Sequence, residues 1–185
     1  TAVGLSALDS NTTADNNSAF GNGVLAANTT GTSNTGVGKN ALEANTTANN
    51  NTAVGKNALG ANTTGASNVA VGQEALSSST TAGNNTAVGR VAGQKTTTGC
   101  QNVAIGTFAH CVNTTGDNNI AIGVCSLCNN TTADENTAVG FKSLYANTTG
   151  AANTAVGLNA LLDATTSTNN TAVGVEALQN ITTGG

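Results

Sequence analysis

The sequence predicts an all-β fold, a parallel β-roll or β-solenoid of eleven 17-residue coils. Three observations predict it. A glycine returns at every seventeenth residue without insertion or deletion, the columns around it are nearly constant, and charged residues, 8% of the chain, keep to fixed places in each repeat. Self-similarity at a short fixed period is the mark of a repeat architecture. The period is set by Gly4, Gly21, Gly38, Gly55, Gly72, Gly89, Gly106, Gly123, Gly140, Gly157 and Gly174.

The repeat is numbered here from Asn51, whose copy reads NTAVGKNALGANTTGAS. Position 1 is Asn in every repeat that contains it, position 5 is always Gly, and positions 13 and 14 are always Thr. Position 3 is Ala except for Gly36, and position 4 is Val or Ile except for Phe20. Position 9 is Leu except for Gly93 and His110. Constant columns of this kind indicate that equivalent residues share one environment.

Stacking explains how so short a unit can fold. Asn, Thr, Gly and Val are weak helix formers, and helical repeats need longer units. A 17-residue coil buries little alone, but stacked coils place each residue over its own copy at about 4.8 Å, where Asn and Thr form ladders. Eleven coils then make a rod of about 50 Å. We expect one domain over residues 1–185 that begins and ends inside a repeat, as a segment of a longer chain would.

The charged residues mark the bends of each coil. All of them fall at repeat positions 6, 7, 10, 11, 16 or 17. A pair of positions that accepts charge is solvated, so these pairs predict three bends with three short strands between them. The constant glycine at position 5 predicts a backbone with positive φ or a close approach of chains.

The alternation of side chains predicts an outward apolar stripe. Neighbouring strand residues point to opposite faces, and both Ala-Val at positions 3 and 4 and Ala-Leu at positions 8 and 9 are apolar. One residue of each pair would fill the coil, and the other would face outward. A stripe of that length exceeds what a monomer usually exposes, so we expect self-association, as a trimer or as an end-to-end filament.

The motif Asn-Thr-Ala-Val-Gly-x-x-Ala-Leu resembles the repeats of trimeric autotransporter adhesin heads and, more closely, those of phage tail-fibre-like and bacterial surface-fibre proteins. Asn102 to Gly106, NVAIG, comes nearest to the adhesin form. The resemblance covers the whole chain. It implies a left-handed parallel β-roll, commonly trimeric, in the shaft or head of an extracellular fibre. The coil of 17 residues is longer than that of the adhesin heads.

Composition argues against other classes. The net charge is -4 and no basic patch occurs, so nucleic acid is not an expected partner. No apolar run is long enough to span a membrane. No nucleophile is paired with a base, so we expect no enzyme and no cofactor. The predicted function is a structural segment of a fibre on a cell or virion surface, with receptors or glycans as partners of its variable bends.

The four cysteines lie in the middle of the chain. Cys111 and Cys128 both hold position 10 in adjacent coils, where stacking would bring their Cα atoms within disulfide range. Free surface thiols are the alternative. Cys125 and Cys128 have the spacing of metal ligands, and His110 and Cys111 lie one coil earlier, at positions 9 and 10. Side chains at these adjacent positions should point apart, so we expect no metal site that includes His110. His110 replaces a Leu and is expected to be a local packing defect.

Two further predictions concern the asparagine and threonine columns. Position 12 begins an N-glycosylation sequon in seven repeats, although the same Asn could form a buried ladder. The threonine columns favour a second function, ice binding by a regular array, but adjacent threonines put only one column outward. The seven sequon asparagines are Asn11, Asn28, Asn45, Asn62, Asn113, Asn130 and Asn147.

Overall fold

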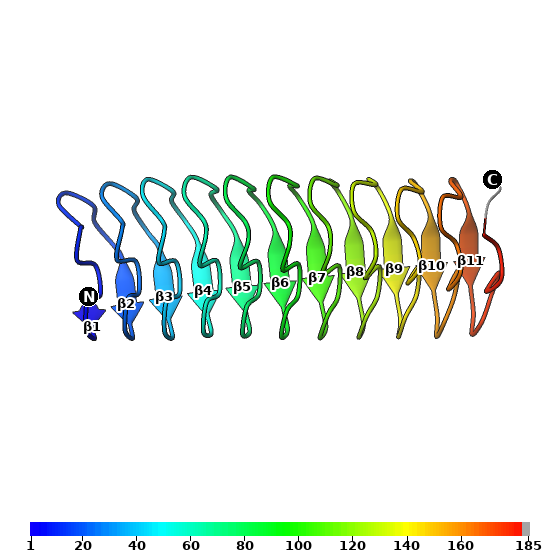
Figure 1. Cartoon of the computed structure of the whole chain (residues 1–185), viewed down its shortest axis with the longest axis horizontal. Helices are drawn as coiled ribbons and strands as arrows, with labels where there is room; N and C mark the ends of the chain where they lie inside the picture. Colours follow the sequence, from blue (N-terminus) through cyan, green and yellow to red (C-terminus); the bar gives the residue numbers. More distant parts are fainter. Residues whose placement is uncertain (183–185) are drawn as a thin grey trace.

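A computed structural model describes residues 1–182 as one straight rod of stacked coils (Figure 1). Its eleven strands form a single sheet in chain order, with β1 and β11 at opposite ends of the rod. We call the coil that contains strand βn coil n. The strands are β1 (Ala2–Val3), β2 (Ser18–Phe20), β3 (Thr35–Val37), β4 (Thr52–Val54), β5 (Val69–Val71), β6 (Thr86–Val88), β7 (Val103–Ile105), β8 (Ile120–Ile122), β9 (Thr137–Val139), β10 (Thr154–Val156) and β11 (Thr171–Val173).

The register of the sheet confirms the β-solenoid. Each strand pairs in parallel with the next, and every pair of partners is 17 residues apart, as Ala53 with Ala70 and Val54 with Val71 are. Parallel neighbours require a crossover, and here the remaining 14 residues of the coil provide it without a helix. About ten turns therefore separate β1 from β11.

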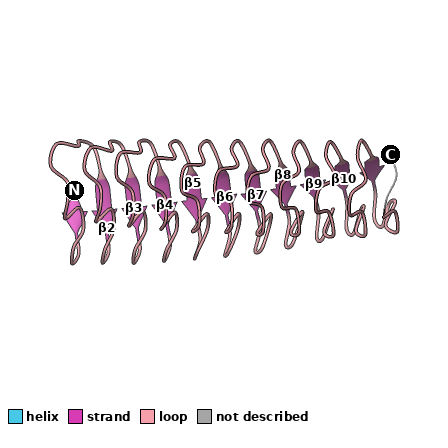
Figure 2. Ribbon diagram, turned by 45° about the horizontal axis from the view of Figure 1, so that its top comes forward, coloured by secondary structure: helices cyan, strands magenta, loops and turns pink. Residues whose placement is uncertain are grey.

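Only one of the three expected strands per coil forms. Positions 2 to 4 are strand, whereas positions 8 and 9 lie in a turn and positions 12 to 15 in irregular chain with a bend at the two threonines (Figure 2). Around positions 8 and 9 the reason is the left-handed backbone of positions 7 and 9, with φ of 57° at Asn57 and 51° at Leu59; a third left-handed residue, Ser67 with φ of 61°, precedes the next strand. A left-handed residue cannot continue an extended strand, so each one turns the chain.

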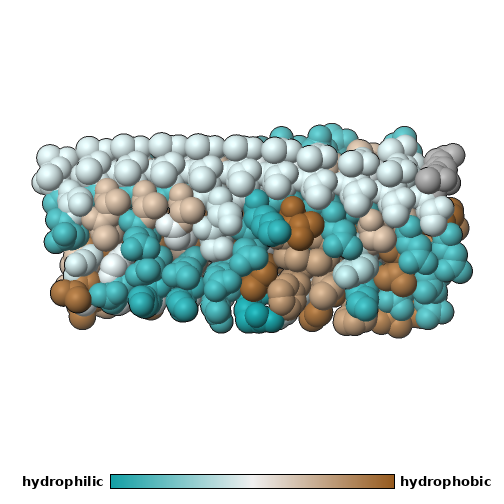
Figure 3. Space-filling model, in the orientation of Figure 1, coloured by the Kyte–Doolittle hydropathy of each residue, from teal (hydrophilic) through white to brown (hydrophobic). Residues whose placement is uncertain are grey.

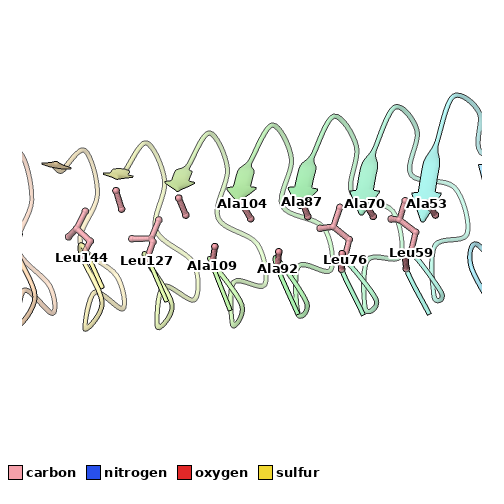
Figure 4. Packing of buried hydrophobic residues seen from close by; sticks show 14 of the residues in the cluster. Ala53, Leu59, Ala70, Leu76, Ala87, Ala92, Ala104, Ala109, Leu127 and Leu144 are labelled. Atoms are coloured by element: carbon pink, nitrogen blue, oxygen red, sulfur yellow. The ribbon is translucent and has the colours of Figure 1, made fainter. Parts of the chain in front are cut away.

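The core is a thin column of alanine and leucine. Strand alanines at position 3 face the leucines of position 9 across the interior of the coils that have both, as Ala53 and Leu59 do (Figure 4). Ala58 and Leu59, at positions 8 and 9, are both fully buried, so the expectation that they point to opposite faces is wrong. The left-handed φ of Leu59 rotates the chain between them, which brings both side chains inward. Position 9 therefore adds nothing to the outward apolar stripe, which is formed by the position 4 residues and, at position 2, by Val69 and Ile120.

Two exceptions in the repeat compensate each other. Val24 holds position 8, where most coils have Ala, and Gly36 holds position 3 in the strand of the next coil. A Cβ on Gly36 would clash with Cγ1 of Val24. The larger side chain thus occupies the space that the missing methyl group leaves, and the packing of the core stays complete.

The position 5 glycines are required for two reasons at once. Gly89 has φ of 134°, a region that L-residues rarely adopt, and a Cβ there would lie 2.7 Å from the carbonyl oxygen of Gly106 in the next coil. Both expectations for this column, positive φ and close approach, are confirmed. The backbones stack so tightly that only hydrogen fits between them.

We expect Gly89→Ala to lower the free energy of unfolding by about 3 kcal/mol or more, because it adds backbone strain and a steric clash. Urea denaturation followed by circular dichroism measures this. The matched control is Gly60→Ala at position 10, where Ala26 stands in another coil and the added Cβ would lie 3.3 Å from Asn57 O. Equal midpoints for the two variants would contradict the role of the glycine column.

Candidate functional site

The asparagines of position 1 hold each strand to its own coil and to its neighbour. Nδ2 of Asn51 donates to the carbonyl of Gly65 at 2.9 Å, within the same coil. Oδ1 of Asn51 accepts the backbone N–H of Asn68 at 2.9 Å, one coil further on. Both side chains are fully buried. One amide thus fixes the bend within its coil and the register between coils, which no shorter or apolar side chain can do.

The asparagines of position 12 form a second, interior ladder. Nδ2 of Asn45 donates to Oδ1 of Asn28 at 2.8 Å, and Nδ2 of Asn62 donates to Oδ1 of Asn45 at 3.0 Å. Of the seven predicted sequon asparagines, Asn11 is partly exposed and the other six are fully buried. A glycan on a buried ladder amide has no room in the folded rod, so the structure favours the ladder reading of these six.

This second ladder is interrupted in the middle of the rod. Ser79 and Thr96 take the place of Asn in coils 5 and 6, and their hydroxyl oxygens are buried without a hydrogen-bond partner. Oδ1 of Asn62, the last amide before the gap, is also unpaired. Each unsatisfied buried polar atom costs stability, so the gap in the ladder has an energetic cost in coils 5 and 6.

The two threonine columns have different environments. At position 13, Oγ1 of Thr63 donates to the carbonyl oxygen of Thr80 at 3.0 Å, so this hydroxyl is used along the rod. At position 14 the side chains are exposed, which confirms that one column faces outward. Figure 3 shows unbroken rows of intermediate hydropathy along one long edge. The outward column is Thr13, Thr30, Thr47, Thr64, Thr81, Thr98, Thr115, Thr132, Thr149 and Thr166.

The position 4 residues form the predicted outward apolar stripe. Val54, Val88 and Ile122 keep 36%, 37% and 37% of their surface exposed although they lie in the middle of a sheet. Coils 8 to 11 add exposed apolar residues at position 6, just beyond the bend. Coils 3, 4 and 6 carry a cation at that position instead. We call the wider part the apolar face; it comprises Ile122, Val124, Val139, Phe141, Val156, Leu158, Val173 and Val175.

Of the four cysteines, the predicted pair comes together. Sγ of Cys111 and Sγ of Cys128 are 2.9 Å apart, and both are free thiols in the structure. Cys100 lies elsewhere, with its sulfur 3.4 Å from the backbone N–H of Gly83. Residues 1–182 contain no group of three or more His, Cys, Asp or Glu side chains arranged to hold a metal ion. The cross-link between Cys111 and Cys128 remains a prediction.

His110 is the packing defect that the sequence indicated. It is fully buried in the leucine column, and its Nε2 lies 3.1 Å from Nδ2 of Asn130. The amide nitrogen is a donor, so Nε2 accepts and the ring proton sits on Nδ1, which has no partner. Burial lowers the pKa of His110 to about 3. The imidazole is therefore neutral at neutral pH. It takes the Nδ2 donor of Asn130, whereas Oδ1 of Asn130 still accepts from Asn147 at 3.2 Å.

No pocket was found in the part of the chain that the structure describes. The same residues include no helix with the length and hydrophobicity needed to cross a membrane. Comparison with family models, curated proteins and solved structures gives no match for this chain. The ladders, the threonine column, the apolar face and the cysteine pair are thus the features on which a functional argument can be built.

We expect the stability of the rod to fall in acid because of His110. The pKa is about 3 in the folded chain and 6.5 when unperturbed, so between these values the unfolded chain binds the proton more readily. The folded chain has its full stability above about pH 6.5, where His110 is neutral in both states. It loses a few kcal/mol of its free energy of unfolding as the pH falls towards 3. Urea denaturation at a series of pH values measures the loss.

The matched variant for this experiment is His110→Leu, which restores the residue of the other coils. In those coils, Nδ2 of a position 12 asparagine donates to Oδ1 of the asparagine one coil earlier. In the variant, Nδ2 of Asn130 can therefore donate to Asn113. We expect this variant to be more stable and to lose less stability in acid. Parallel pH profiles for the two proteins would show that the imidazole is not responsible.

Proposed function

We propose that this chain is a non-catalytic segment of an extracellular fibre, a shaft on a cell or virion surface that spaces or displays other parts. The observation that carries the proposal is the unbroken stacking of equivalent coils from β1 to β11. Each repeat lengthens such a rod by one coil and adds no globular domain. The likeness of its motif to surface-fibre and adhesin-head repeats supports the same role.

The bonding within the rod suits a load-bearing part. Hydrogen bonds run along the long axis at every seam, the contact between two adjacent coils. They form both in the sheet, as from Thr52 N to Asn68 O at 2.8 Å, and in the turns, as from Leu59 N to Ala75 O at 3.0 Å. The position 1 amides add bonds between side chain and backbone. Bending or stretching the rod must break several of these bonds at one seam together, because each residue contacts only its own and adjacent coils.

Lateral self-association completes the proposal. Three-residue strands over a rod of about 50 Å give a sheet face of about 500 Å². A stable interface usually buries about 800 Å² per partner, so one face against one partner is small. Three rods around a common axis, each touching two neighbours, bury more of each rod. We therefore favour a trimer, with the apolar face turned inward and the variable bends exposed to receptors or glycans.

Immunogold electron microscopy of the cell or particle that makes the protein tests the fibre role. We expect gold on filaments outside the surface, and rods of about 50 Å when the isolated chain is stained by itself. Antibody absorbed with purified protein is the control. Labelling confined to the cell interior would refute the proposal.

We expect the double variant Val124→Lys and Phe141→Lys to weaken self-association about 100-fold, because it buries unpaired charges in the interface. Lys39 and Lys56 already occupy this repeat position, so the fold accepts lysine there. Sedimentation equilibrium measures the association. The control is Thr64→Lys and Thr81→Lys on the threonine column. Equal association of both variants and the parent would exclude the apolar face as the interface.

The second candidate function is ice binding, and the exposed threonine column favours it. Ten threonines project outward at position 14 with the spacing of the coils, about 4.8 Å. Their neighbours at position 13 are turned to the backbone, so the array is one residue wide. Thermal hysteresis measured on the parent and on the Thr64→Lys and Thr81→Lys variant separates the two functions, since a fibre segment needs no activity of this kind.

A further inference from the structure

Cys111 and Cys128 lie at one seam of the rod, where coil 7 meets coil 8. They hold the same repeat position, so stacking places their backbones about 4.8 Å apart, within the 4.4–6.8 Å range of disulfide Cα separations. Their sulfur atoms are 2.9 Å apart. That is less than 1 Å beyond a disulfide bond length of about 2.05 Å. A bond between them needs almost no movement of the backbone.

One backbone hydrogen bond at this seam is longer than its equivalents in the other coils. The backbone bond from Val112 N to Cys128 O measures 3.3 Å, whereas the equivalent bond from Ala146 N to Leu162 O measures 3.0 Å. In coil 4 the turn is closed by a bond from Asn62 N to Leu59 O at 3.1 Å. Coil 7, which has His110 in place of this leucine, shows no such bond among the described backbone contacts.

The two thiols are electrostatically unequal. The hydrogen bond with the Cys128 thiol lowers the pKa of Cys111 and outweighs burial, which raises it. The same hydrogen bond raises the pKa of Cys128, so Cys128 keeps its proton. Burial raises the pKa of Cys125, the third thiol nearby. Thiolate character, which determines reactivity towards oxidants, therefore concentrates on Cys111.

We propose that Cys111 and Cys128 are a dithiol oxidation site that a hydroperoxide converts into a disulfide, clamping coil 7 to coil 8 at the seam beside His110. The role is separate from the fibre function and holds for the rod in either functional setting. Cys111 keeps 7% of its surface exposed and Cys128 is partly exposed, so a molecule of the size of hydrogen peroxide reaches the pair from outside.

The reaction balances in two steps. The Cys111 thiolate attacks one peroxide oxygen, the O–O bond breaks, and Cys111 becomes a sulfenic acid while the departing hydroxide takes a proton to form water. Cys128 then attacks the Cys111 sulfur, the S–O bond breaks, and the second hydroxide leaves with the Cys128 proton as water. Two thiols and one hydrogen peroxide give one disulfide and two waters, with two electrons passing to the peroxide.

The test uses the variant Cys100→Ser and Cys125→Ser, which retains only the pair. After treatment with hydrogen peroxide, we expect a single chain whose intact mass is lower by two hydrogens. Hydrogen exchange of the Val112 amide should slow on the order of 100-fold, because the bond closes a loop of 17 residues across that seam. Reduction should reverse both changes.

The matched control is Cys111→Ser and Cys128→Ser. Ser77 stands at this repeat position in coil 5, so the fold tolerates serine there, and we expect neither the mass loss nor the slower exchange. In Cys128→Ser alone, a 1,3-diketone reagent should trap the sulfenic acid on Cys111. Addition of oxygen without loss of hydrogen in the paired variant, linkage between two chains, or unchanged exchange at Val112 would overturn the proposal.

Discussion

The structure depends on the contact of one glycine backbone with the next at position 5. A Cβ on Gly89 would meet the carbonyl of Gly106 at 2.7 Å, so any side chain in this column would push the coils apart. Separation at this point would lengthen the hydrogen bonds of the adjoining strands and misalign the amides of Asn51 and its copies. The close stack of coils is thus the condition for both the sheet and the side-chain ladders.

Because each coil rests on its neighbours alone, the rod responds locally to exceptions in its repeat. The side chain of Val24 fills the space that Gly36 leaves in the adjacent coil, so the core stays filled. The exceptions around coils 5 to 7 are not compensated in this way, since Ser79, Thr96 and His110 leave buried polar atoms unpaired. The cysteine pair lies directly beside this segment. Variation in a solenoid can therefore set the stability of one seam without changing the overall shape.

We propose a different role for each face of the rod. Polar columns bind coil to coil, the outward valines and isoleucines offer a surface to other rods, and the bends carry all the charges. None of the charged side chains is buried. The bends can accordingly vary while the core columns remain fixed, which suits a fibre that keeps its shape and presents a changing surface.

The sequence by itself determined the coil length, the stacking register, the solvated bends and the outward valine column, because each is a direct consequence of period and residue type. It also placed Cys111 next to Cys128, since equal repeat positions lie one above the other. Only the tertiary structure decided that Leu59 points inward beside Ala58, because its left-handed φ is stable only when the stacked coils bury the side chain and satisfy the backbone. The same holds for the position 12 amides and for His110, whose burial and partners depend on neighbours 17 and 20 residues away.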